Sequence, residues 1–142
     1  MANINSPAVT ALATQGAYVD KNQYMGRTLR IPFFIDNGVS LINSGDTITF
    51  TANLPTKCKA LGVHIKTAGV GNSSALTFSA GGTALNAAPV VGGALDAFYT
   101  FTVAGSDFPD VSGKTIIGTV SVGAWDDGAN DLTGWIELLT NQ

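Results

Sequence analysis

The stretch Gly45–Gly82 reads GDTITFTANLPTKCKALGVHIKTAGVGNSSALTFSAGG and contains three short patterns in which apolar residues recur at every second position. The apolar residues are Ile48 and Phe50 in the first pattern, Leu61, Val63 and Ile65 in the second, and Leu76, Phe78 and Ala80 in the third. Successive side chains of a β-strand point to opposite faces of a sheet. A period of two therefore predicts three strands, each with one buried face.

The alternation continues on both sides of this stretch. It covers 28–35 and, briefly, 39–42 on the N-terminal side, and 98–103, 115–122 and 134–140 on the C-terminal side. The connections are short and rich in glycine, and no segment has the period of an amphipathic helix. About eight short strands in such an arrangement predict an all-β protein, an antiparallel β-sandwich of jelly-roll or immunoglobulin-like type.

Three local features add detail to this prediction. Pro32 lies inside the first strand and predicts an edge position or a bulge, because proline has no N–H to donate to a neighbouring strand. The segment 81–96 is rich in Gly and Ala and predicts a long loop with one helical turn near Ala94. In the strand 115–122, the residues expected to point inward are Ile116, Gly118, Val120 and Val122.

The chain is poor in charged residues, which make up 12% of its 142 residues, about half of the usual share. Such a surface suits a protein that packs against neighbouring molecules. Of the seven bases, six lie before Gly71, whereas seven of the ten acids lie after it. This asymmetry fits complementary patches between copies or toward a partner, and it equally fits a solvated surface. The bases are too few and too scattered for a nucleic-acid partner.

The sequence predicts one domain, residues 28–142, preceded by an extended N-terminal arm, residues 1–27. Tyr18 and Tyr24 favour docking of this arm, because large aromatic rings are costly to leave exposed. No signal peptide and no run of about 20 apolar residues is visible, so no membrane partner is expected. Cys58 is the only cysteine, so no intrachain disulfide forms and folding in a reducing cytoplasm is expected.

The sequence offers little for catalysis. His64 is the only histidine, and no motif links a carboxylate or a nucleophile to it. Cys58 lies between two lysines, which favour a lowered thiol pKa. Without a known geometry, one histidine and one cysteine do not make a catalytic dyad. We therefore expect no catalytic residue, no cofactor and no enzymatic activity, and we interpret His64 as a surface or interface residue.

Two other groups of residues have alternative interpretations. Asp126–Asp131 offers oxygen ligands that calcium accepts, but it lacks EF-hand spacing, and its Asp-Gly and Asn-Asp pairs also favour a tight turn. One histidine and one cysteine cannot build a structural zinc site, so no metal site is expected. Trp125 and Trp135 either line a sugar-binding face or belong to the core.

Several short motifs follow one another in and around the opening stretch. Gly45-Asp46-Thr47-Ile48 is followed by Leu54-Pro55, by Ala60-Leu61-Gly62-Val63, by a Gly/Ser turn, by Leu76-Thr77-Phe78 and by Gly82. This order resembles small virion structural proteins of tailed bacteriophages, in which a GD-I strand and an LP turn precede a valine-rich strand. The resemblance covers about 40 of the 142 residues.

The resemblance implies a capsid decoration (cement) protein, or another accessory virion component such as the base of a head fibre. A decoration protein would be a non-enzymatic structural protein made in the host cytoplasm and located on the capsid surface of the virion. Its implied partners are the major capsid protein and copies of itself, as a homotrimer. An arm that adds a β-strand to a neighbour would supply contacts over a wide surface. The candidate partner-binding residues are Tyr18, Tyr24, Arg27 and Arg30. The alternatives are a glycan- or receptor-binding module of a tail or head fibre, and a small enzyme.

Overall fold

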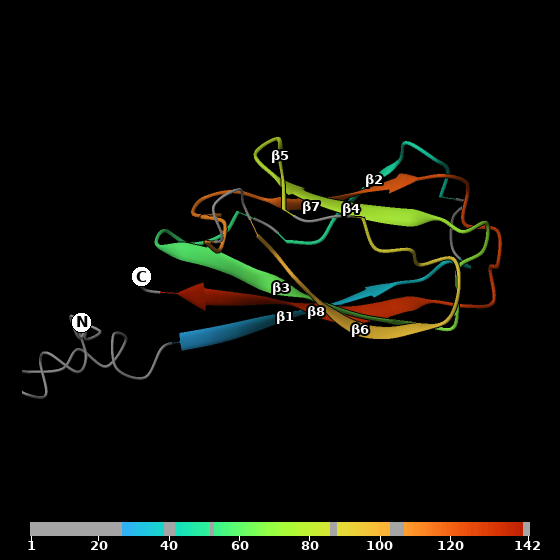
Figure 1. Cartoon of the computed structure of the whole chain (residues 1–142), viewed down its shortest axis with the longest axis horizontal. Helices are drawn as coiled ribbons and strands as arrows, with labels where there is room; N and C mark the ends of the chain where they lie inside the picture. The colour runs from blue at the N-terminus through green and yellow to red at the C-terminus, as the bar shows by residue number, and fades with distance from the viewer. Residues whose placement is uncertain (1–26, 39–41, 52, 86–87, 103–106, 141–142) are drawn as a thin grey trace, which may run out of the picture.

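The computed structural model describes residues 27–38, 42–51, 53–85, 88–102 and 107–140, and these form two antiparallel four-stranded sheets (Figure 1). The predicted β-sandwich is confirmed, and no helix occurs among the described residues. The strands are β1 (Arg27–Ile35), β2 (Thr47–Thr49), β3 (Cys58–Thr67), β4 (Ala75–Ala80), β5 (Thr83–Ala84), β6 (Leu95–Thr100), β7 (Ile116–Ser121) and β8 (Leu132–Thr140).

The strands pair in a nested order. One sheet has the order β1-β8-β3-β6 and the other has the order β2-β7-β4-β5. The first strand thus pairs with the last, the second with the seventh, the third with the sixth and the fourth with the fifth, as in one long hairpin rolled over itself. This is the jelly-roll arrangement, which decides between the two sandwich types that the sequence left open.

The core lies between the two sheets and is built from the alternating residues of the sequence. Val63, Ile65, Leu76 and Phe78 are fully buried. A chain of phenylalanine rings crosses the core, with ring centroids 4.8 Å apart for Phe33 and Phe50, 5.2 Å for Phe50 and Phe78, and 5.5 Å for Phe78 and Phe101. Because Phe33 belongs to β1 and Phe78 to β4, these contacts join the two sheets.

Three sequence predictions about individual positions are wrong. Leu61 is only half-buried and lies outside the core, because a β-bulge between Ala60 and Gly62 breaks the alternation of β3. No helical turn forms at Ala94, which directly precedes β6. Val122 is 70% exposed, because it follows β7 with a φ of 75° and turns away from the core.

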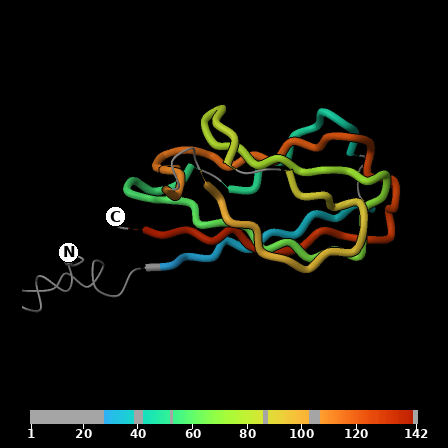
Figure 2. The backbone as a smooth tube through the Cα atoms, viewed as in Figure 1, coloured from blue at the N-terminus to red at the C-terminus, as the bar shows by residue number. Residues whose placement is uncertain are grey.

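The ends of the described chain meet at one end of the sandwich. Arg27 and Thr140 are Cα partners in the pairing of β1 with β8, and Figure 2 shows the blue start and the red end of the tube close together. Pro32 lies on an edge as predicted, since β1 pairs with β8 alone among the described strands. Most of the predicted arm, residues 1–26, and most of the predicted strand 39–42 lie outside the described residues. None of the described segments is a helix long and apolar enough to cross a membrane.

Candidate functional site

The solvent-facing side of the sheet β1-β8-β3-β6 is here called the outer face. Pro32, Trp135, His64 and Phe98 form one row across the four strands, because each is the Cα partner of the next. In this row the sheet presents three rings side by side to the solvent face. An aromatic surface of this kind is a candidate contact site.

His64 is held by two residues of this face. Its imidazole stacks on the indole of Trp135, with ring centroids 4.2 Å apart and an interplanar angle of 5°. Its Nε2 lies 2.7 Å from Oδ1 of Asp96, which β6 presents beside β3. The sequence did not suggest this pair, because 32 residues separate its members and only the pairing of β3 with β6 brings them together.

Arg30, one of the predicted partner-binding residues, lies on the other side of Trp135. Its Cζ is 4.9 Å from the centroid of the Trp135 ring, and its Nε is 3.7 Å from Oε1 of Glu137. Arg30 comes from β1 and His64 from β3, the two strands that flank β8, so the indole is contacted from both flanks. This arrangement fixes the orientation of Trp135 and pairs the charge of Arg30 within the chain.

The groups shown to contact His64 are an indole ring and a carboxylate. In the described part of the chain, no serine or cysteine side chain forms a hydrogen bond with the imidazole, although a histidine with a carboxylate would need such a nucleophile for covalent catalysis. The surrounding groups are aromatic rings and paired charges. That the protein is not an enzyme stays a prediction.

Exposed apolar residues lie at both edges of this sheet. Phe34 of β1 is 60% exposed on the outer face, and Phe98 of β6 is exposed on the same face at the opposite edge. Leu29 is also exposed, but it lies on the face of β1 that carries Ile31 and Phe33 toward the core. Arg27 is the first residue of β1, and its side chain lies outside the described residues, as do Tyr18 and Tyr24. Of the four predicted partner-binding residues, the structure therefore locates the side chain of Arg30 only.

The two tryptophans do not form a common sugar-binding face. Trp125 is 1% exposed and belongs to the core, so the core interpretation is correct for this residue. Trp135 lies on the outer face, where His64 stacks against its ring. A sugar ring stacks on an exposed aromatic face, so neither indole is a free platform of that kind.

Cys58 is buried, and its environment differs from the one that its sequence neighbours suggested. Burial raises the pKa of the Cys58 thiol, and the nearby carboxylate of Asp110 raises this pKa further. The expected lowering by the neighbouring lysines is therefore wrong. Lys57 is exposed and the ammonium group of Lys59 is paired with Asp107, whereas Cys58 is buried.

Because of this burial, we expect Cys58 to react with iodoacetamide at least about a hundredfold more slowly in the native protein than in the protein unfolded in urea. The thiol stays protonated at neutral pH, and the reagent reaches it only when the structure opens. Mass spectrometry of samples quenched at several times gives the two rates. Equal rates would contradict the buried position.

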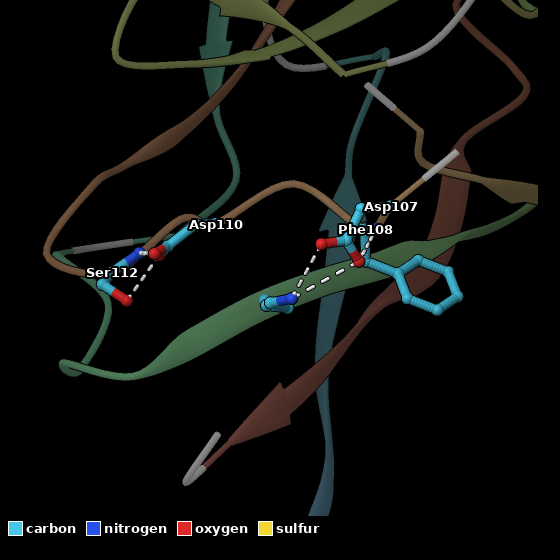
Figure 3. A network of polar contacts seen from close by, with 5 residues as sticks. Asp107, Phe108, Asp110 and Ser112 are labelled. Carbon is cyan, nitrogen blue, oxygen red and sulfur yellow. Dashed lines mark hydrogen bonds and ion pairs between the residues drawn. The ribbon is translucent and has the colours of Figure 1, made fainter. Parts of the chain in front are cut away.

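Two carboxylates of the segment after residue 106 take part in contacts with the start of β3 (Figure 3). Lys59 Nζ lies 3.1 Å from Oδ2 of Asp107, and this hydrogen-bonded ion pair lowers the pKa of Asp107. The hydroxyl of Ser112 donates to Asp110 over 2.6 Å, which lowers the pKa of Asp110, and the N–H of Cys58 donates to the same hydroxyl oxygen. Both carboxylates are therefore engaged in contacts that hold this segment against the start of β3.

The acidic segment Asp126–Asp131 forms a turn. Both carboxylate oxygens of Asp127 accept hydrogen bonds from within the segment, from the N–H of Ala129 and the amide of Asn130. Asp131 accepts the backbone N–H of Asn37. Among the described residues, no group of three or more His, Cys, Asp or Glu side chains is placed to hold a metal ion. The turn interpretation of this segment therefore has direct support from its contacts.

Two comparisons of the chain with known proteins found no match. No protein-family model matches the chain, and no curated protein matches it.

Proposed function

We propose that the chain is a non-enzymatic structural protein of a phage virion that binds the outside of the capsid shell and stabilises it. The motif order between Gly45 and Gly82, the low share of charged residues and the candidate arm support this proposal. The jelly-roll fold is in keeping with it, since this architecture occurs in viral capsid and lectin domains. Fold alone does not assign a function.

The observation that carries the proposal is the β1 edge of the outer face. The candidate arm enters the domain through β1, whose second edge has no strand partner among the described strands. Phe34 is exposed on the outer face of β1, and Leu29 is exposed on its other face. An unpaired strand edge with exposed apolar side chains is a template on which a neighbouring protein can add a strand or dock.

The charged groups of the outer face favour burial against a broad protein surface. Arg30 is paired with Glu137, and His64 is hydrogen-bonded to Asp96. A charged group that already has a partner in the same chain costs less free energy to bury when a second protein covers it. The proposed partners are the major capsid protein and, in a homotrimer, two further copies of the chain.

Deletion of residues 1–20 tests the proposal. We expect the truncated protein to fold, with a thermal midpoint within about 3 °C of the full chain, because residues 27–140 supply every strand of the two described sheets. We expect it to lose its binding to capsids that lack the protein, measured by cosedimentation. The full chain is the positive control, and light scattering of both proteins reports whether a trimer forms.

Two outcomes would contradict the proposal at different points. If the full chain does not cosediment with capsids of the phage that encodes it, the decoration function is wrong. If the truncated protein binds as tightly as the full chain, the function stands but the arm is not its anchor. In that case Phe34→Ala, which changes an exposed residue of the β1 edge, becomes the variant that should weaken binding.

A further inference from the structure

A shallow hollow of about 610 Å³ lies at the end of the sandwich opposite the chain termini. Three elements form it: the end of β3, the start of β6 and the segment that leads into β8. Its polar lining consists mainly of Lys66, Asp96, Asn130, Asp131 and Thr133. Leu95 and three alanines provide the apolar part. The volume lies within the range of small-molecule sites, and the hollow is open to solvent.

Several polar groups of the hollow keep hydrogen-bonding capacity for a ligand. The ammonium group of Lys66 is exposed and forms no hydrogen bond or ion pair with any described residue. Asp96 uses one carboxylate oxygen for His64, 2.7 Å away, and its second oxygen has no partner among the described residues. Asn130 donates its amide to Asp127, so its carbonyl oxygen is still an acceptor.

The charge balance limits the class of ligand. One ammonium group faces two carboxylates, and the Asp131 carboxylate already accepts a backbone N–H from Asn37 over 3.2 Å. Two carboxylates repel a phosphate or another anion. A wholly apolar ligand would bury the carboxylates and the amide without replacing their hydrogen bonds to water. A neutral molecule with several hydroxyl groups fits both the donors and the acceptors.

We propose that this hollow binds a neutral sugar, either a single unit or the end of a glycan chain. Adjacent hydroxyls would donate to the free oxygen of Asp96 and accept from the ammonium group of Lys66, which are Cα partners on neighbouring strands. The C–H face of the sugar would lie on Leu95 and the alanines. The hollow is open and contains no aromatic platform, so we expect millimolar dissociation constants.

The hollow lies far from the start of β1, which the candidate N-terminal arm precedes. β1 has nine residues, so about 27 Å of strand separates Arg27, next to the candidate arm, from Ile35, near the hollow. If the arm anchors the protein to a capsid, which is the proposed function, the sugar site lies at the far end of the domain, away from the anchored end. Sugar binding itself does not depend on that anchor.

The test is a titration of the ¹⁵N-labelled full chain with glucose, galactose, N-acetylglucosamine and inorganic phosphate, each to about 50 mM, followed by NMR amide shifts. We expect at least one sugar to shift the amides of residues 94–96 and 129–133 in a saturable way, and phosphate to leave them unchanged. We expect Lys66→Ala and Asp96→Asn each to weaken this binding about tenfold, because each removes a charge-assisted hydrogen bond.

Lys114→Ala is the matched control, because Lys114 lies outside the hollow and donates to the backbone oxygen of Asp110. It should bind the sugar within about twofold of the unchanged chain. The proposal is overturned if no sugar shifts these amides, if phosphate shifts them instead, or if both hollow variants bind as well as the control. The titration contains no capsids, so its failure is separate from a failure of the capsid-binding experiment.

Discussion

Phe78→Ala is expected to lower the free energy of unfolding by about 3–5 kcal/mol. Phe78 is fully buried, and its ring contacts those of Phe50 and Phe101 in the chain of phenylalanines between the sheets. Its removal leaves a cavity at the point where the two sheets meet, and the surrounding strands cannot close it without losing their pairing. For a domain of this size, the thermal midpoint should fall by about 10 °C.

Urea denaturation followed by tryptophan fluorescence measures this loss. Phe34→Ala is the matched control, because it removes the same ring from an exposed position on the outer face. We expect that control to change the free energy of unfolding by no more than about 0.5 kcal/mol. Equal losses for the two variants would mean that Phe78 does not hold the sheets together.

Gly134→Ala is expected to lower the free energy of unfolding by about 3 kcal/mol or more, although it adds a single methyl group. A Cβ at residue 134 would lie 1.8 Å from the backbone oxygen of His64 and 3.0 Å from Cζ of Phe33. The oxygen belongs to the backbone of β3, so it can move only if β3 separates from β8. The substitution therefore acts on the pairing at the centre of the sheet, where β8 lies between β1 and β3.

Gly93→Ala is the control for this substitution. No atom lies within 4 Å of a Cβ built at residue 93, and its φ lies outside the left-handed region. A methyl group there should be neutral or should stabilise the protein by up to about 1 kcal/mol, because alanine restricts the unfolded chain. Thermal melts of both variants measure the difference, and similar midpoints would contradict the close approach at residue 134.

The sequence predicted the strands because the signal for a strand is local. Alternation at Ile48 and Phe50, or at Leu76 and Phe78, depends only on residues two positions apart, and each of these positions points toward the core in the structure. The edge position of Pro32 was also predictable, because a missing N–H has the same consequence in any sheet. The exception is Leu61, since an alternating pattern does not reveal a bulge.

The candidate sites were less predictable, because they depend on residues that are distant in sequence. His64 and Asp96 meet only through the register of β3 and β6, and Lys66 meets Asp96 for the same reason. The pKa of Cys58 follows from its burial and from Asp110, which is 52 positions away, and not from the two lysines beside it. The charges of the sequence neighbours therefore predict the wrong direction for the pKa of Cys58.

The nested pairing of the strands also determines when the protein can fold. β1 has its only described pairing with β8, and β8 contains the last described residues of the chain. On a ribosome that adds about 5–20 residues each second, β1 waits several seconds for its partner to be made. The sheet with β1, β8, β3 and β6 therefore closes only after β8 has been synthesised. Until then, the apolar faces of β1 and β3 depend on temporary protection from aggregation.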